Sequence, residues 1–149
     1  ETEMMVLFAA RTQHLHAVLR PAIARGQWVL CDRFTDATFA YQGGGRGIPF
    51  ERITRLETFV QEDFQPDLTL LLDLPIEEGL ARATERGGRA DRFEKQDLAF
   101  KERIRQSYLR RQRDYPGRIQ RVDASGSVDE IQTILQHHIQ KLLKSGTNP

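Results

Sequence analysis

A chain of 149 residues is long enough for one sizeable hydrophobic core and too short for two, so we expect a single domain. Its 22 basic and 21 acidic residues leave a formal net charge of +1, which gives no overall electrostatic case for a nucleic-acid or membrane partner. The lone cysteine, Cys31, excludes an intramolecular disulfide and fits a reducing cytoplasm.

Arginine dominates the basic residues, with 18 Arg against 4 Lys. A planar guanidinium grips phosphate at two points, whereas the lysine ammonium is a point charge, so the bias fits a protein that handles anions. Genomic base composition explains it equally well. The bias therefore needs support from local motifs.

Apolar residues recur at helical spacing over residues 2–25, which predicts one long helix ended by Gly26. Pro21 inside it predicts a kink or break near Arg20. The chain starts with Glu rather than Met, and its first residues already have helical spacing. From this we expect the sequence to begin inside a longer protein.

Short apolar runs alternate with helical patterns in the rest of the chain. This alternation predicts an α/β fold of three layers, with a mostly parallel sheet flanked by helices. The sheet is small for its helices, so we also expect it to lack N-terminal strands. The expected strands are residues 28–31, 68–72 and 119–122, and the expected helices are 50–61, 76–86, 97–115 and 128–143.

Each expected strand ends in an aspartate: Asp32, Asp73 or Asp123. Ligands collect at the carboxyl ends of parallel strands, so these acids are site candidates. Asp32 is followed by Arg33, a pair in which the carboxylate can face a metal and the guanidinium a phosphate. In the plainer alternative, Asp32 caps the next helix and Arg33 pairs with it.

Three consecutive glycines, Gly43 to Gly45, follow in a segment expected to be a loop. Glycine permits unusual backbone conformations and lets a ligand or a neighbouring chain approach closely. The segment is not a Walker loop, because no Gly-Lys-Ser or Gly-Lys-Thr occurs in the sequence. It also fails the dinucleotide fingerprint, because Pro49 delays the next helix.

A second basic cluster lies on the end of a helix and the Gly87-Gly88 segment after it. A mobile arginine-bearing flap of this kind can neutralise charge on a transferred phosphoryl group. The alternative is a solvated helix end whose cations suit the helix dipole. The cluster consists of Arg82, Arg86, Arg89 and Arg92.

Other polar residues carry weaker signals. Arg11 stands amid apolar residues, where a lone arginine is more often at the surface than in a site. The arginines of residues 103–113 are expected on the solvated face of a helix packed through Phe100, Ile104 and Tyr108. The histidines lack metal-ligand spacing, so no structural zinc is expected.

Five motifs occur in a specific order and spacing. They are Phe8-Ala9-Ala10-Arg11; Asp32-Arg33-Phe34; Thr38-x-x-Tyr41-Gln42-Gly43-Gly44-Gly45-Arg46-Gly47; Gln65-Pro66-Asp67-Leu68-Thr69 leading to Leu72-Asp73; and Asp91-Arg92-Phe93-Glu94. Over essentially its whole length, the sequence resembles the bacterial thymidylate kinases.

The resemblance implies a P-loop nucleoside monophosphate kinase fold. It implies an enzyme that transfers the γ-phosphoryl group of ATP to dTMP with Mg²⁺, giving dTDP and ADP for dTTP biosynthesis, as a cytoplasmic homodimer. The glycine segment then belongs to the dTMP side, and the ATP cradle with its lysine is expected upstream of Glu1. The chain as given, an incomplete kinase domain over residues 1–149, is expected to be inactive alone.

The resemblance also assigns roles to individual residues. Asp32 looks like the acid that organises Mg²⁺, directly or through water, and Arg33 like the arginine that holds the dTMP phosphate. Arg11 looks like the residue that hydrogen-bonds the thymine carbonyl. Thr38 resembles the contact to the base edge, and Tyr41 the ring beneath the deoxyribose.

Other matches are looser. Gln42 would support the same pocket, and residues 82–94 would form the lid, in which Arg86 is the best match to the catalytic lid arginine. Many relatives stack thymine on an aromatic residue at the position of Leu7, whereas here the aromatic residue is Phe8. The other matched lid positions are Arg82, Arg89 and Arg92, in a lid one residue longer than expected, and residues 145–149 are expected to be a frayed tail.

Two alternatives remain open. The first is a related kinase that acts on another nucleotide or nucleoside. The second, from a different class, is a truncated module that binds nucleotides without catalysis. Comparing several phosphate acceptors separates the first from dTMP phosphorylation, and a Walker loop in the upstream coding sequence would exclude the second.

Overall fold

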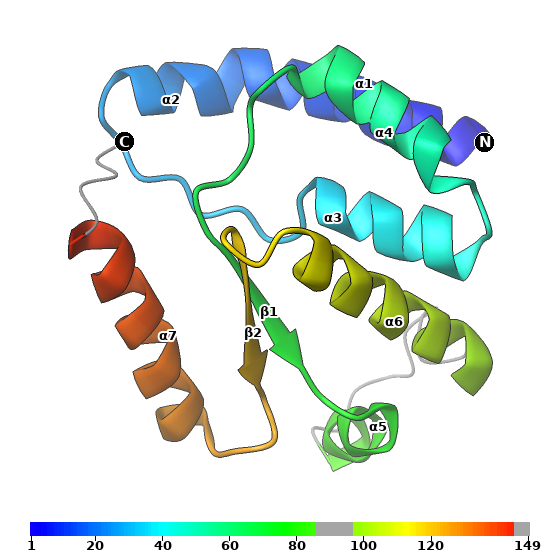
Figure 1. The fold of residues 1–149 in the computed structure, drawn as a ribbon, viewed down its shortest axis with the longest axis vertical. Helices are drawn as coiled ribbons and strands as arrows, with labels where there is room; N and C mark the ends of the chain where they lie inside the picture. Colours follow the sequence, from blue (N-terminus) through cyan, green and yellow to red (C-terminus); the bar gives the residue numbers. More distant parts are fainter. Residues whose placement is uncertain (86–96, 145–149) are drawn as a thin grey trace.

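The computed structural model describes residues 1–85 and 97–144, and no helix in these ranges is long and apolar enough to cross a membrane. The described elements are arranged as shown in Figure 1. They are α1 (Thr2–His14), the π-helix η1 (Leu15–Leu19), α2 (Arg20–Ala24), α3 (Thr35–Thr38), the π-helix η2 (Phe39–Gly45), α4 (Phe50–Gln61), β1 (Thr69–Asp73), α5 (Ile76–Glu85), α6 (Leu98–Asp114), β2 (Ile119–Asp123) and α7 (Val128–Lys144).

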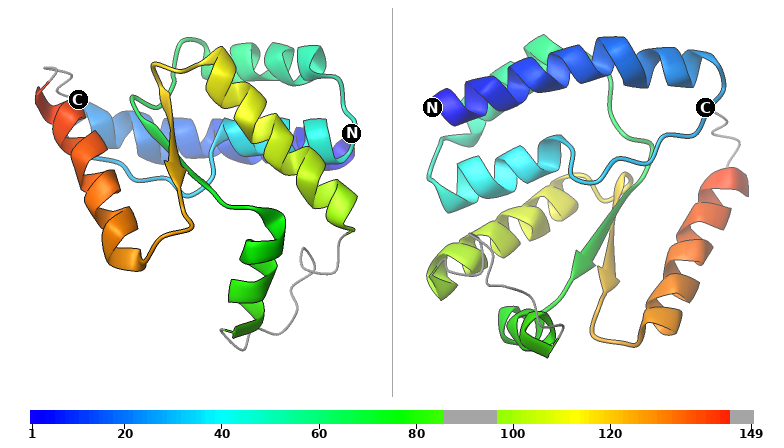
Figure 2. Two further views of the ribbon diagram at one scale, coloured as in Figure 1. Left: turned by 60° about the horizontal axis from the view of Figure 1, so that its bottom comes forward. Right: turned by 180° about the vertical axis from the view of Figure 1, so that it is seen from behind.

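The sheet of the described chain consists of two parallel strands. β1 pairs with β2 in a register that runs from Thr69 opposite Ile119 to Asp73 opposite Asp123. α6 and α7 lie on opposite sides of the two strands in each view of Figures 1 and 2. This is the expected α/β arrangement of a parallel sheet between helical layers.

The expected strand over residues 28–31 does not form. Residues 27–31 are extended, and their apolar side chains face solvent, with Leu30 fully exposed and Trp28 57% exposed. A strand requires a neighbour whose backbone completes its hydrogen bonds. No strand within residues 1–85 and 97–144 pairs with this segment, so the prediction was wrong for this chain.

The long N-terminal helix is continuous, but its geometry changes where Pro21 predicted a kink. The π-helical turn η1 comes immediately before Arg20, and α2 carries Pro21 in its first turn. A proline ring inside a helix clashes with the carbonyl one turn earlier and leaves it without a donor. Insertion of a wider π turn is a recognised way to accommodate such a defect. The expected change near Arg20 therefore takes this form, without a break.

The main hydrophobic cluster joins three helices rather than the sheet. Met4 and Phe8 of α1 pack with Phe39 of η2 and Ile53 of α4, and all four side chains are buried. The rings of Phe39 and Phe50 meet edge to face, with centroids 5.3 Å apart. This cluster fixes the helical layer that carries the candidate site.

The three glycines form part of η2, so the expectation of a loop was wrong. A Cβ added to Gly44 would lie 2.7 Å from the carbonyl oxygen of Arg103 and would collide with Ser107 Oγ. A Cβ on Gly45 would lie 2.9 Å from the Phe100 ring. The expected close approach is confirmed, and the neighbour that approaches is α6.

Candidate active site

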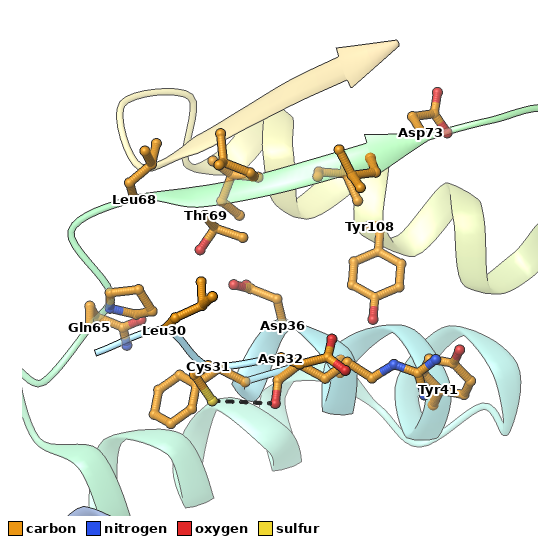
Figure 3. A pocket seen from close by; sticks show the side chains of 18 of the residues that line it. Leu30, Cys31, Asp32, Asp36, Tyr41, Gln65, Leu68, Thr69, Asp73 and Tyr108 are labelled. Carbon is orange, nitrogen blue, oxygen red and sulfur yellow. Dashed lines mark hydrogen bonds between the residues drawn. The ribbon is translucent and has the colours of Figure 1, made fainter. Parts of the chain in front are cut away.

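A cavity of about 980 Å³ lies between residues 27–34 and β1. Most of its lining is apolar; besides these two segments it includes residues 64–68, which lead into β1, and side chains from the N-terminal helix, α3, η2, α5, α6 and α7. Polar groups gather along one part, and Figure 3 shows several of them. They are Asp32, Arg33, Asp36, Tyr41, Asp73 and Tyr108.

Asp32 and Arg33 lie at this cavity with exposed side chains. Arg33 has φ 62°, in the left-handed region that costs a non-glycine residue about 1–3 kcal/mol and that clusters at functional sites. Its guanidinium lies 5.4 Å from the centroid of the Tyr41 ring. The following helix begins after Phe34 and has no side-chain cap, so Asp32 does not play the capping role of the plainer alternative.

Arg11 is positioned by a contact between residues 27 apart in sequence. Its Nη2 donates a hydrogen bond to Thr38 Oγ1 at 3.1 Å, and its guanidinium lies 4.8 Å from the Phe8 ring centroid and 5.5 Å from that of Phe34. Nη1 is buried and has no hydrogen-bond partner within the described chain. The side chain is only partly exposed, which disfavours the plainer alternative of an ordinary surface arginine.

Burial lowers the pKa of the Arg11 guanidinium, while the nearby acidic groups, first among them Glu57, act in the opposite direction. A buried donor without a partner is costly, and such a group often marks a place where a ligand supplies the acceptor. Because Phe34 lines the cavity and Arg11 lies over its ring, the Arg11–Thr38 pair adjoins the cavity without lining it.

Other expected substrate contacts lie elsewhere. Phe8 is 2% exposed and belongs to the hydrophobic core, whereas Leu7 is 38% exposed, and neither is among the described residues that line the cavity. Gln42 is buried and donates to Glu3 Oε1 at 3.0 Å, which directs its amide to α1. Glu3 also pairs with Arg46. Gln42 therefore braces the helical layer around the site.

Tyr108 was expected only to pack α6, but the structure places it in the candidate site. Its hydroxyl points from α6 toward Asp32 and Tyr41 (Figure 3), and the two tyrosine ring centroids are 6.5 Å apart. Burial raises the pKa of Tyr108, so the phenol stays protonated and can donate. Sequence reasoning missed it because its spacing from Phe100 and Ile104 is that of an apolar stripe.

Arg105 and Arg111, which were expected on the solvated face of α6, instead hold buried carboxylates. Arg105 Nε donates to Asp73 Oδ1 at 2.7 Å. The other oxygen of Asp73, Oδ2, accepts a hydrogen bond from Nε of Arg121 on β2 at 2.9 Å. Arg111 is 4% exposed and donates to Asp36 Oδ1 at 2.9 Å. Asp73, at the end of β1, therefore has its charge neutralised by two guanidinium groups, and the expectation was wrong for Arg105 and Arg111.

The expected lid is described only at its start. Arg82 of α5 donates hydrogen bonds to the carbonyl oxygens of Ala124 at 2.6 Å and Gly126 at 3.4 Å, and also to that of Ser125. It thereby holds the turn between β2 and α7. Arg86, Arg89 and Arg92 lie outside the described residues, as does the expected frayed tail, residues 145–149.

The described residues contain no group of three or more His, Cys, Asp or Glu side chains placed to hold a metal ion. Mg²⁺ in phosphoryl-transfer sites is commonly held by one or two carboxylates together with substrate phosphates and water. Asp32 is an exposed carboxylate at the cavity, beside the guanidinium of Arg33. The residues present therefore fit a magnesium ion that the nucleotides help to bind.

Comparison with known proteins decides the family. The family model "Thymidylate kinase" matches residues 1–134. The chain is 55% identical over 144 residues to the thymidylate kinase of Pseudomonas syringae pv. tomato, covering 97% of this chain and 68% of that protein. The chain belongs to the thymidylate kinase family. The thymidylate kinase of Pseudomonas putida (strain F1) is 59% identical over 132 residues, which cover 89% of this chain and 62% of that protein.

A solved structure supports the same assignment. The thymidylate kinase of Ehrlichia chaffeensis superimposes with a TM-score of 0.73 at 25% sequence identity, covering 93% of this chain and 64% of that one. The expected P-loop kinase-like α/β fold and the phosphotransferase family are thus confirmed. The chain spans roughly two thirds of the length of these thymidylate kinases.

Proposed function

We propose that the protein transfers the γ-phosphoryl group of ATP to dTMP, forming dTDP and ADP for dTTP biosynthesis. The observation that carries the proposal is the Arg11–Thr38 pair beside Asp32 and Arg33, because Arg11 Nη1 is buried without an acceptor in the described chain. A thymine carbonyl would supply that acceptor. Such a carbonyl restores a hydrogen bond that the protein alone leaves unmade.

The phosphate of dTMP is assigned to Arg33. Its guanidinium is exposed at the cavity beside the Tyr41 ring, where a deoxyribose can lie against the aromatic face. Asp32 would hold Mg²⁺ together with the phosphates of both nucleotides. A guanidinium fork and a metal ion relieve the repulsion between two anions that must meet in line.

The phosphate loop for ATP is absent from the 149 residues, which contain no Gly-Lys-Ser or Gly-Lys-Thr. We place the strand that leads into this loop in the cavity between residues 27–31 and β1. Within the described chain β1 pairs only with β2, so its other edge is open toward this cavity. Leu30 and Trp28 are exposed on the opposite wall, as expected for residues that a further strand would cover.

The lid remains assigned to residues 82–94, with Arg86 as the arginine that meets the transferred phosphoryl group. Arg82 supports this arrangement from its fixed position against the turn after β2. A guanidinium placed on a transferred phosphoryl group stabilises the charge that develops there.

We also propose that two copies associate through the N-terminal helix. Val6, Met5 and Val18 are 62%, 53% and 50% exposed along α1 and η1, and Phe59 on the neighbouring α4 is 84% exposed. Apolar side chains gathered on adjoining helices favour burial against a second copy. The unpaired Cys31 supports a location in the reducing cytoplasm.

The proposal is tested by ADP release from the protein expressed from its complete gene, with MgATP and each of several acceptors. We expect dTMP to be preferred over dUMP, dCMP and deoxynucleosides. Preference for another acceptor would favour a related kinase. Nucleotide binding without turnover by any acceptor would favour a non-catalytic module and would overturn the proposal.

A further inference from the structure

Asp36 is a buried carboxylate at the edge of the cavity. It lies on α3, the four-residue helix that starts two residues after Arg33 and ends at Thr38. Only 7% of Asp36 is exposed. A buried carboxylate is costly unless the protein supplies hydrogen-bond donors and opposite charge, so its partners must be strong ones.

Two guanidinium groups supply these partners. Arg111 Nε donates to Asp36 Oδ1 at 2.9 Å, and Arg118 donates from both terminal nitrogens, to Oδ2 at 2.7 Å and to Oδ1 at 2.9 Å. Arg118 also donates to Thr69 Oγ1 at 3.0 Å, and Arg111 lies 3.6 Å from Glu57 Oε1. One carboxylate therefore ties α3 to α4, α6, β1 and the residue before β2.

The start of this helix has little of its own to hold it. α3 runs without a break into η2, because Phe39 keeps helical backbone angles, but its first turn begins after Phe34 with no side-chain cap. Arg33, with its left-handed backbone, lies two residues before α3, and Thr38, which accepts the hydrogen bond of Arg11, is its last residue. The geometry of the proposed dTMP contacts therefore depends on what anchors α3.

The anchor is electrostatic. Burial by itself would raise the pKa of Asp36, but the hydrogen bonds and charges of Arg118 and Arg111 lower it overall. The carboxylate is therefore anionic at neutral pH and attracts both guanidinium groups. Without its charge, the guanidinium groups of Arg111 and Arg118 would lose the carboxylate that they share, which would leave buried positive charge without this partner and favour a shift of α3.

We propose that Asp36 is a positioning residue for dTMP. Through Arg111 and Arg118 it holds α3 in the place where Arg33 can contact the phosphate and Thr38 the base of the same nucleotide. This inference rests on the proposed function. Asp36 acts through these neighbours, because both of its carboxylate oxygens accept hydrogen bonds from Arg111 and Arg118. Its loss should therefore weaken the use of dTMP much more than the use of ATP.

The test compares Asp36→Asn with Glu62→Gln in the protein expressed from its complete gene. Glu62 is the control because its carboxylate also accepts a hydrogen bond from an arginine, at 3.0 Å, but that arginine is Arg20 rather than one that holds Asp36. Small displacements in a site cost up to about a hundredfold, so Asp36→Asn should raise the KM for dTMP roughly ten- to hundredfold. The KM for ATP should stay within about twofold. Both KM values of Glu62→Gln should also stay within about twofold, because its ion pair with Arg20 is exposed and does not hold α3.

Three results would overturn the inference. One is an unchanged KM for dTMP in Asp36→Asn, another is an equal rise for both nucleotides, and the third is an equal effect in Glu62→Gln. If Asp36→Asn fails to fold, Arg118→Lys serves instead, because it keeps the charge and loses the fork. It should raise the KM for dTMP about fivefold or more, since a bidentate pair is replaced by a single contact, and no rise would overturn the inference.

The wild-type protein separates the two proposals. If it does not phosphorylate dTMP, the proposed function fails and this inference fails with it. If it does phosphorylate dTMP, the variants test the positioning role alone.

Discussion

Replacing Gly44 with alanine should separate η2 from α6. The added Cβ would lie 2.7 Å from the carbonyl oxygen of Arg103 and 2.8 Å from the Cβ of Ser107, and it would collide with Ser107 Oγ, which itself donates to that carbonyl at 2.9 Å. A backbone oxygen and a Cβ cannot rotate away. The two helices must therefore move apart, which disturbs the layer that carries the candidate site.

The magnitude follows from two opposing effects. Overpacking of this kind costs about 1–3 kcal/mol, and the contact with rigid atoms places it at the upper end. Alanine regains up to about 1 kcal/mol over glycine in a helix, so the net loss in the free energy of unfolding should be about 2 kcal/mol. For a protein of this size, that corresponds to a fall in Tm of about 4–8 °C.

The assay is thermal unfolding followed by far-ultraviolet circular dichroism, with Gly79→Ala as the matched control. Gly79 is also inside a helix, α5, but a Cβ there would meet nothing closer than Leu74 Cδ2 at 3.8 Å. Gly79→Ala should leave Tm unchanged or raise it. Equal Tm values for the two variants, or a Gly44→Ala protein as stable as wild type, would refute the packing argument.

Three further predictions follow from the site and its charges. Arg11→Lys should raise the KM for dTMP about tenfold, because lysine cannot reach Thr38 and the base with two nitrogens, and steady-state kinetics that show no rise would exclude the assigned contact. The pKa of Asp36 is lowered below its ordinary value of 3.8, so its contribution to the stability of the folded protein is fully present above pH 3.8 and is lost as the pH falls through the folded-state pKa. The free energy of unfolding of Asp36→Asn should therefore decrease less steeply with falling pH than that of the wild type. Acid unfolding curves of equal steepness would contradict this. Val6→Glu should shift sedimentation from dimer to monomer, and an unchanged species would argue against the α1 interface.

Much of the fold could be predicted because amphipathic helices carry their own signal. The helix at residues 50–61 was expected with the bounds it has, since its apolar positions repeat every turn and Pro49 marks its start. The strand at 28–31 could not be predicted from its apolar run alone. Strand formation depends on a hydrogen-bonding neighbour, and within the described chain none is present.

The candidate site was predictable where motifs are contiguous and not where distant residues meet. Arg11, Arg33 and Thr38 came from motifs, although the family resemblance supplied their roles. The role of Asp36 could not be predicted because its partners Arg111 and Arg118 lie 75 and 82 residues away in the sequence. The sequence around these two arginines does not distinguish a residue in a buried ion pair from one on a solvated helix face.

The conformation of the glycine segment, Gly43 to Gly45, also depends on residues distant in sequence. Three glycines predict a loop because glycine has a low helix propensity. In the structure the segment is helical, and its lack of side chains lets α6 approach η2 closely. Local propensity gave the wrong structure, while the argument from close approach gave the right physical reason.

The measurement that decides whether Arg33 serves dTMP phosphorylation is dTMP-dependent ADP release by the protein expressed from its complete gene, compared with that of its Arg33→Ala variant. We expect the wild type to prefer dTMP and its turnover to fall by about a hundredfold or more in the variant, because a preorganised cation on the phosphate is lost. Near-normal turnover of dTMP by Arg33→Ala would contradict this expectation.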